Sequence, residues 1–112
     1  MALPTQIDLV KLHAAAGEAC KLLKVLSNPD RLLLLCQMTQ GEFSVKELET
    51  STGIGQPTLS QQLTVLRGEQ LVQTRRDGKQ IFYSIASAEA MAVLQVLYQL
   101  YCPTPQEICN DN

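Results

Sequence analysis

The spacing of apolar residues predicts a chain built mainly from helices. Most apolar positions recur every three or four residues, which gathers them on one side of a helix. One stretch differs, because Asp77-Gly78 is a strong hairpin-turn signal between the segments Val72–Arg76 and Lys79–Ile85. We therefore expect a mainly α fold with a small β-hairpin. The predicted helices run from about Asp8 to Leu26, from Pro29 to about Met38, onward from Val45, onward from Pro57, and after Ser87 to Tyr101 or Cys102.

Two short helices joined by a tight turn are predicted before the hairpin. Ser44 and Glu47 have the spacing of a capping box, so the first of these helices should begin directly after Ser44. Gly53 and Gly55 interrupt it and permit a sharp turn. Pro57 suits the first position of the next helix, because its missing N–H would be unpaired there anyway. This order of helix, turn, helix and hairpin predicts a winged helix-turn-helix.

The second of these helices separates an apolar face from a polar face. Leu59, Leu63 and Leu66 form a stripe that should face the core. Short polar side chains cover the rest and can hydrogen-bond to base edges and phosphates, although a merely solvated face would look the same. The basic tip of the hairpin favours DNA. The candidate DNA-binding residues are Gln56, Thr58, Ser60, Gln61, Thr64, Arg75, Arg76 and Lys79.

The first and last helices carry more apolar surface than one small domain needs to bury. The second helix is apolar nearly all round and should be the buried centre, whereas the first has a wide stripe rich in alanine. Helix-turn-helix proteins usually pair two half-sites through two-fold symmetry. We therefore expect a homodimer through the first and last helices, although a helix sunk in its own core would show the same pattern. The candidate interface residues are Leu12, Ala15, Ala19, Leu94, Leu97, Tyr98 and Tyr101.

The net charge of −2 argues mildly against nucleic acid as a partner. The distribution of charge changes that picture, because four basic residues outnumber two acidic ones between Gln56 and Gln80. This region therefore carries +2, and the remainder of the chain carries −4. A basic edge on an acidic body is compatible with binding DNA in one orientation, and it predicts weak non-specific binding.

At 112 residues the chain is long enough for one domain with a modest core. We expect this domain at residues 8–102, between flexible tails at 1–7 and 103–112. We see no export signal near the N-terminus and no stretch of about 18 apolar residues that could span a membrane. We therefore expect a cytoplasmic protein, in which cysteines are more often free, metal-bound or redox-active than paired in structural disulfides.

The four cysteines lie in contrasting surroundings. Cys36 falls within the apolar second helix, where a cysteine often only fills space. Cys102 precedes Pro103 near a helix end, where its thiol should reach solvent. Cys20 on the first helix and Cys109 in the tail have no evident role.

One motif and the order of the elements carry a resemblance to a known family. The motif is LKVLSNPDRL at residues 23–32, within the predicted order of four helices, hairpin and last helix. Over roughly residues 15–102 the chain resembles the ArsR/SmtB family of dimeric winged-helix repressors. The chain departs from the wider family at Gln62, where many members have a histidine.

Three further segments, 41–45, 53–63 and 79–83, are similar to the sulfide-responsive branch of that family. Repressors of this branch carry one cysteine in the second helix and one at the end of the last helix, and Cys36 and Cys102 match these positions. The resemblance implies that the two cysteines form a dithiol switch that senses persulfide or polysulfide. The oxidised protein would release the operator DNA of sulfide-detoxification genes.

The resemblance also bears on whether the protein senses a metal ion instead of persulfide. Metal-sensing relatives use a cysteine cluster before the recognition helix or aspartate and histidine on the last helix, but residues 45–52 contain no cysteine and the sole histidine is His13. We therefore predict neither a metal site nor a cofactor. The alternative trigger is a thiophilic metal, a metalloid or a general oxidant acting on Cys36 and Cys102, and a metal would need a further ligand.

The sequence also bears on two other classes of function, a protein-binding winged helix and an enzyme. A winged helix that binds a protein instead of DNA would keep the same fold and lose only the role of the polar helix face. An enzyme is not expected, because the chain lacks a Ser/His/Asp set, a recognisable Cys/His pair and a phosphate-binding glycine loop.

Overall fold

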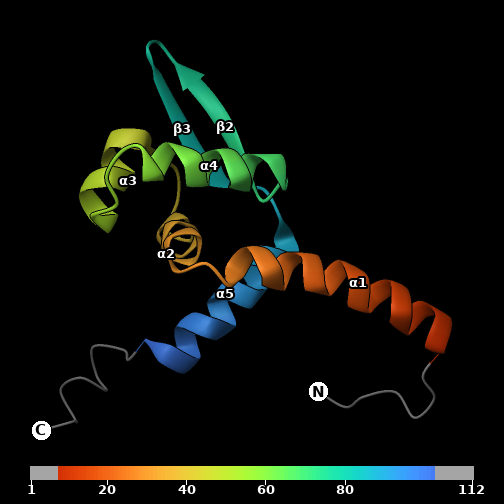
Figure 1. Cartoon of the computed structure of the whole chain (residues 1–112). Coiled ribbons are helices and arrows are strands. Elements are labelled where there is room, and N and C mark those ends of the chain that lie inside the picture. The colour runs from red at the N-terminus through yellow and green to blue at the C-terminus, as the bar shows by residue number, and fades with distance from the viewer. Residues whose placement is uncertain (1–7, 103–112) are drawn as a thin grey trace, which may run out of the picture.

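A computed structural model of the protein describes residues 8–102, so the tails predicted at 1–7 and 103–112 lie outside the described residues. The fold is a winged helix-turn-helix, as predicted (Figure 1). None of the helices between residues 8 and 102 is both long and apolar enough to cross a membrane. The elements are α1 (Leu9–Leu26), α2 (Pro29–Met38), β1 (Phe43–Ser44), α3 (Val45–Thr52), α4 (Thr58–Gly68), β2 (Val72–Asp77), β3 (Gln80–Ile85) and α5 (Ala88–Tyr101).

Polar side chains begin most of the helices by accepting hydrogen bonds from free backbone N–H groups. Asp8, Asn28 and Ser87 each cap a helix in this way. The predicted capping box at α3 is confirmed, since the N–H of Glu47 donates to Ser44 Oγ at 3.1 Å. In return, the N–H of Ser44 donates to Glu47 Oε1 at 2.8 Å.

The start of α4 corrects one prediction. Pro57 lies one residue before the helix, at the N-cap, where it offers no side-chain acceptor. The neighbouring Gln56 takes over this task, because its Oε1 accepts a hydrogen bond from the N–H of Ser60 at 3.1 Å. The helix therefore begins at Thr58, with the capping group supplied by the residue before proline.

The wing is part of a three-stranded antiparallel sheet with the order β1-β3-β2. The two-residue strand β1 was not predicted, and it pairs Phe43 with Tyr83. The hairpin turn is displaced by one residue from the predicted position, because Asp77 still pairs with Gln80 across the turn. Gly78 has a φ of 63°. A glycine with positive φ fits the first central position of a hairpin turn.

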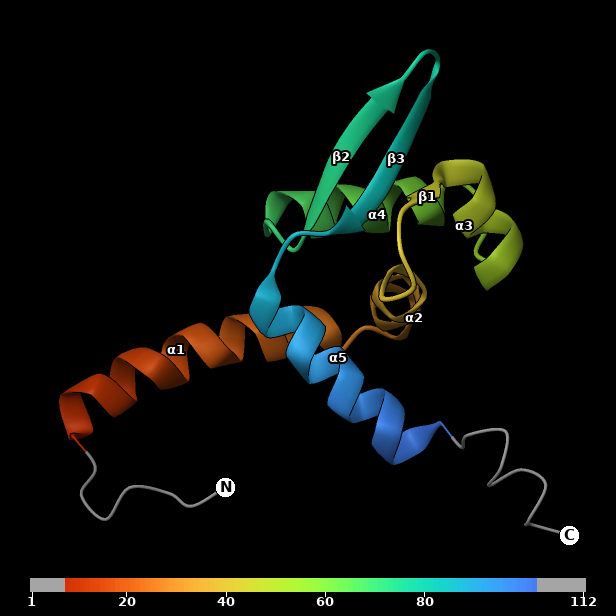
Figure 2. The same cartoon turned by 180° about the vertical axis from the view of Figure 1, so that it is seen from behind.

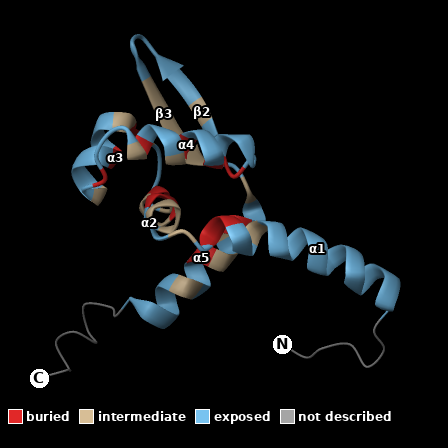
Figure 3. Cartoon of the chain, viewed as in Figure 1, coloured by how far each residue is buried: buried red, intermediate tan, exposed pale blue. Residues whose placement is uncertain are grey.

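Helix α2 is the centre of the domain, as predicted. It contacts α1, α3, α4, β3 and α5. Figures 1 and 2 show α3, α4 and the hairpin on one side of α2, and α1 and α5 on the other. The buried positions in Figure 3 gather on the sides of the helices that face α2. The fully buried large side chains are Leu34, Leu35, Met38, Leu48, Leu59, Leu63, Leu66 and Leu94, which include the predicted stripe of α4.

Helices α1 and α5 leave most of their surface uncovered. Helix α1 buries only Val25 and Leu26 at its C-terminal end, and the rest of it extends away from the domain (Figure 1). Helix α5 buries only Ala90 and Leu94. The large exposed apolar residues on these two helices are Leu9, Val10, Leu12, Leu23, Val96, Tyr98, Leu100 and Tyr101.

Candidate functional site

The polar face of α4 carries the predicted DNA-binding side chains, but they are not equally free. Gln56 and Ser60 are tied to each other, since Ser60 Oγ donates to Gln56 Oε1 at 2.7 Å. Thr64 Oγ1 donates to the carbonyl oxygen of Ser60 at 2.8 Å. Thr58 is half-buried, whereas Gln61 is exposed and forms no side-chain hydrogen bond within residues 8–102. Gln61 is therefore the side chain on this face that is most available to a base edge.

The basic residues of the wing also fall into two kinds. The guanidinium of Arg75 is held by Glu42, with Nε at 3.0 Å from both carboxylate oxygens and Nη2 at 2.8 Å from Oε1. The hydrogen bonds from Arg75 hold the pKa of the Glu42 carboxyl below its usual value. Arg76 and Lys79 are exposed and have no ion-pair partner among the described residues. These two are the free cations of the wing.

The two candidate switch cysteines belong to two helical segments that contact each other, α2 and the end of α5. Cys36 is half-buried on α2, and Cys102 is exposed directly after α5. Burial raises the pKa of the Cys36 thiol, and the charge of a nearby Cys102 thiolate raises it further. Both effects favour the neutral thiol of Cys36 over its thiolate, as expected for a cysteine inside an apolar helix.

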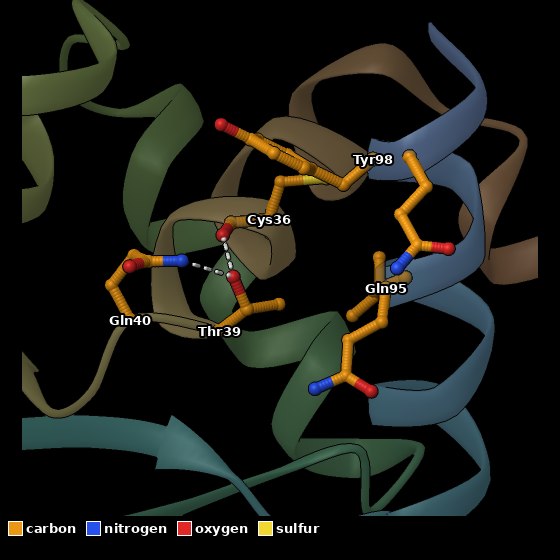
Figure 4. Close-up of a pocket in the computed structure, with 7 residues that line it drawn as sticks. Cys36, Thr39, Gln40, Gln95 and Tyr98 are labelled. Atoms are coloured by element: carbon orange, nitrogen blue, oxygen red, sulfur yellow. Dashed lines mark hydrogen bonds between the residues drawn. The ribbon is translucent and has the colours of Figure 1, made fainter. Parts of the chain in front are cut away.

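A cleft of about 350 Å³ between α2 and α5 gives access to Cys36 (Figure 4). Its floor is held by local hydrogen bonds, since Thr39 Oγ1 donates to the Cys36 carbonyl at 2.6 Å and Gln40 Nε2 donates to Thr39 Oγ1 at 3.2 Å. The lining mixes polar and apolar groups and carries no side chain that is charged at neutral pH, and Tyr98 extends beside Cys36 (Figure 4). The cleft is lined by Cys36, Thr39, Gln40, Leu94, Gln95, Tyr98 and Gln99.

One side chain that the sequence analysis missed joins three helices. Arg31 on α2 donates from Nε to the carbonyl oxygen of Val25 in α1 at 2.9 Å. Its Nη1 donates to Gln62 Oε1 in α4 at 3.1 Å. A basic residue beside a run of leucines, as in α2, is a signal that could have pointed to such a role.

The predicted dimer interface needs one correction. Leu94 is 0% exposed within a single protomer, where it packs in the core, so it has no surface to offer to a partner. Leu97 is half-buried, and the remaining candidates are exposed. Ala15 and Ala19 line a groove of about 710 Å³ between α1 and α5. The alanines thus leave a recess on the exposed side of α1, as their small side chains allow.

The other candidate ligands are isolated. Cys20 and His13 are exposed on α1, and Cys109 lies outside the described residues. Between residues 8 and 102, no three His, Cys, Asp or Glu side chains gather closely enough to hold a metal ion.

Both the sequence and the structure of this chain are similar to those of known proteins. Residues 28–74 match the model of the family described as "Bacterial regulatory protein, arsR family". The biofilm growth-associated repressor of Xylella fastidiosa is 55% identical over 91 residues, which cover 81% of this chain and 80% of that protein. The crystal structure of the repressor BigR from Xylella fastidiosa superposes with a TM-score of 0.80 at 49% identity, covering 88% of this chain and 100% of that one. A homodimeric winged helix-turn-helix DNA-binding domain from Mycobacterium bovis, 28% identical, has a TM-score of 0.68 and covers 88% of this chain and 89% of that one.

Proposed function

This chain belongs to the arsR family of bacterial regulatory proteins, and we propose that it is a homodimeric repressor whose DNA affinity is controlled by sulfur chemistry at Cys36 and Cys102. The inducer is a persulfide or polysulfide, and the regulated genes serve sulfide detoxification. The observation that carries the sensing role is the contact between α2 and α5, because α2 holds the half-buried thiol of Cys36 and α5 ends directly before the exposed thiol of Cys102.

DNA binding is supported by the exposed polar face of α4 and the free cations of the wing. Gln61 presents a side-chain amide, which can donate to and accept from a base edge in the major groove. Arg76 and Lys79 are placed to contact phosphates, which position a protein on the duplex without reading its sequence. Two protomers would present two α4 helices to half-sites that are about 34–36 Å apart, one turn of DNA.

The proposed chemistry needs no external oxidant. The thiolate of Cys102, the more exposed cysteine, attacks the outer sulfur of a persulfide R–S–SH, so that R–S⁻ leaves and Cys102 becomes a persulfide. The thiolate of Cys36 then attacks Sγ of the Cys102 persulfide, the bond from Sγ to the outer sulfur breaks, and HS⁻ leaves as the disulfide forms. The inducer sulfur is reduced to sulfide, and the two cysteines are oxidised. A longer inducer chain would leave additional sulfur atoms in the bridge.

The cleft beside Cys36 supports access of a small inducer. It is open to solvent and lined by amide and hydroxyl groups, and no side chain that is charged at neutral pH lines it. Burial raises the pKa of Cys36 and so disfavours its thiolate, which favours Cys102 as the cysteine that reacts first.

A mechanical link between the thiols and the DNA-binding helix supports regulation. A bond between Cys36 and Cys102 would pull α5 against α2, and Arg31 joins α2 to both α1 and α4. A shift of α2 would therefore reach the helix that contacts DNA and the helix expected at the dimer interface. Couplings between two such sites are typically about 1–3 kcal/mol, or 5- to 150-fold in affinity.

The test uses the purified protein and DNA from upstream of its own gene. Cys36→Ser and Cys102→Ser should bind this DNA as the unmodified protein does and should ignore glutathione persulfide, whereas Cys20→Ser should respond normally. Mass spectrometry should find Cys36 linked to Cys102 only after persulfide treatment. A Cys36→Ser protein that still releases its DNA with persulfide would refute the switch, and release by arsenite or Zn²⁺ without a Cys36–Cys102 link would support the metal alternative.

A further inference from the structure

We propose that Arg75 is a positioning residue that holds the wing in place through Glu42, and that the phosphate contacts of the wing come from Arg76 and Lys79 instead. This inference rests on the proposed DNA binding and assigns different roles to three basic residues that sequence alone treats as equivalent. The observation behind it is an acid–aromatic–base row across the sheet, formed by Glu42, Phe82 and Arg75, which we call the wing clamp.

In the wing clamp, the guanidinium of Arg75 is contacted by a carboxylate and by an aromatic ring. The carboxylate of Glu42 receives three N–H···O contacts from Arg75, at 3.0, 3.0 and 2.8 Å. The guanidinium carbon of Arg75 also lies 4.8 Å from the ring centroid of Phe82. A guanidinium that is held at its edge by a carboxylate and at its face by an aromatic ring has a fixed orientation.

The register of the sheet explains why these three side chains meet. Arg75 on β2 and Ser44 on β1 both pair with Phe82 on the central strand β3. Glu42 precedes Ser44 by two residues, so it follows the same face of the sheet. The wing clamp therefore crosses all three strands and connects the outer strand of the wing to the segment that enters α3.

The alternation of side chains places Arg76 on the opposite face. Val72 is only 4% exposed and packs in the core, so residues 72, 74 and 76 of β2 follow the core side of the hairpin. Helix α4 contacts β2 on this side. Arg76 thus shares a side of the wing with α4, whereas Arg75 lies on the other side with Glu42.

The charge balance leads to the same assignment. Glu42 neutralises Arg75, and the carboxylate of Asp77 lies 3.8 Å from Nη1 of the same guanidinium. A phosphate would have to displace one or both carboxylates before it could bind Arg75. Arg76 and Lys79 have no such competitor within residues 8–102, so their charges remain available.

The wing needs an anchor because it projects from the domain as two strands (Figures 1 and 2). An isolated two-stranded hairpin is at best marginally stable in water. The outer strand β2 pairs with β3 along its length, but β1 reinforces the hairpin only at Phe43 and Ser44. The wing clamp supplies a further contact at Arg75, near the middle of β2.

The test measures operator affinity against salt concentration for an isoelectric double variant, Glu42→Gln with Arg75→Gln. Each phosphate contact contributes about 0.9 to the slope of log K against log salt concentration. Because the original pair is neutral, we expect the double variant to keep the slope of the unmodified protein. Arg76→Gln should lower the slope by about 1.8, because each protomer of the dimer loses one phosphate contact. A double variant whose slope falls by the same amount as that of Arg76→Gln would overturn the proposal.

A charge reversal tests the positioning role directly. Arg75→Glu alone should weaken operator binding at least about 10-fold, and Glu42→Arg in the same chain should restore most of the loss. Heteronuclear NOE values of the wing amides, measured without DNA, should fall in Arg75→Glu and recover in the double variant. If neither operator affinity nor the NOE values recover in the double variant, the wing clamp is refuted. If the unmodified protein does not prefer its operator to random DNA, DNA recognition fails, and the NOE arm still decides the wing clamp.

Discussion

Arg31 donates a hydrogen bond from Nη1 to Oε1 of Gln62 across 3.1 Å, and this contact joins the helix that carries Cys36 to the helix that carries the proposed DNA-binding side chains. The two residues are 31 positions apart in the chain. Since Nε of Arg31 is fixed on the Val25 carbonyl, the guanidinium also transmits the position of α1. This contact gives the proposed switch a route from thiol to DNA that can be broken by one substitution.

We predict that Gln62→Ala weakens the coupling between oxidation and DNA release. The reduced variant should still bind the operator, but the ratio of its oxidised and reduced Kd values should approach 1. Gln62→Glu keeps an acceptor for Arg31, so its ratio should stay near that of the unmodified protein even if its added charge lowers both affinities. Fluorescence anisotropy of both redox states measures these ratios. A Gln62→Ala variant with an unchanged ratio would show that the contact carries no coupling.

Gln61 is expected to read a base, because its side chain is exposed on α4 and unpaired within the described residues. Gln61→Ala should cost about 1–3 kcal/mol on the operator and abolish discrimination at one base pair, measured on a set of single-base operator variants. Gln73→Ala also removes an exposed glutamine, and it should leave base discrimination unchanged at every operator position. Equal discrimination by Gln61→Ala and the unmodified protein would place base reading elsewhere.

The pKa of Cys36 predicts how its reactivity depends on pH. Alkylation follows the thiolate, so the rate at Cys36 should rise with a midpoint above the value of about 8.5 for a free cysteine. In Cys102→Ser the midpoint should move down, because the charge of Cys102 is one cause of the raised pKa. It should remain above the free value, since burial is the larger cause. Iodoacetamide labelling with mass spectrometry provides the profile, and a midpoint below that of free cysteine would contradict it.

The same raised pKa has a consequence for stability. A thiol whose pKa is higher in the folded than in the unfolded protein stabilises the fold below the unfolded pKa. That contribution is lost as the pH rises through the folded pKa. The free energy of unfolding of the reduced protein should therefore fall at alkaline pH, and less so in Cys36→Ala.

Dimerisation can be tested on α1 without disturbing the core. Leu12 is 47% exposed, so Leu12→Glu adds a charge to the expected interface and removes no core contact. We expect a folded monomer at concentrations where the unmodified protein is a dimer, as seen by sedimentation velocity and circular dichroism. Gln73→Glu adds the same charge on β2, outside the expected interface, and should remain dimeric. A dimeric Leu12→Glu protein would remove α1 from the interface.

Local sequence signals predicted most of the fold. The capping box of Ser44 and Glu47, the Asn28–Pro29 helix start and the leucine stripe of α4 each depend on residues a few positions apart. Such contacts are determined by the period of the helix and can be read without knowledge of the tertiary structure. The exposure of Cys102 was expected from its place at a helix end before Pro103 and is confirmed, whereas Cys36, expected inside an apolar helix, is half-buried.

The missed contacts of Arg75 and of Arg31 with Gln62 depend on residues far apart in sequence. Arg75 looked like a free cation because its partner, Glu42, lies 33 residues earlier and comes near only when β1 joins the sheet. Strand β1 has two residues and therefore no period to detect. The apolar pattern of α5 cannot tell a side chain that faces its own core, such as Leu94, from one that faces a partner.

The central position of α2 also sets the order in which parts of the protein open. Because five other elements contact α2, its backbone can open only when the whole domain unfolds. The last turn of α5 ends at the exposed Tyr101 and Cys102, so it can fray at a small fraction of that free energy. One thiol of the proposed switch is thus held at the centre of the domain, and the other follows a helical turn that can open. The rate at which they join should therefore respond to mild denaturant well below the unfolding midpoint, through fraying of a single helical turn.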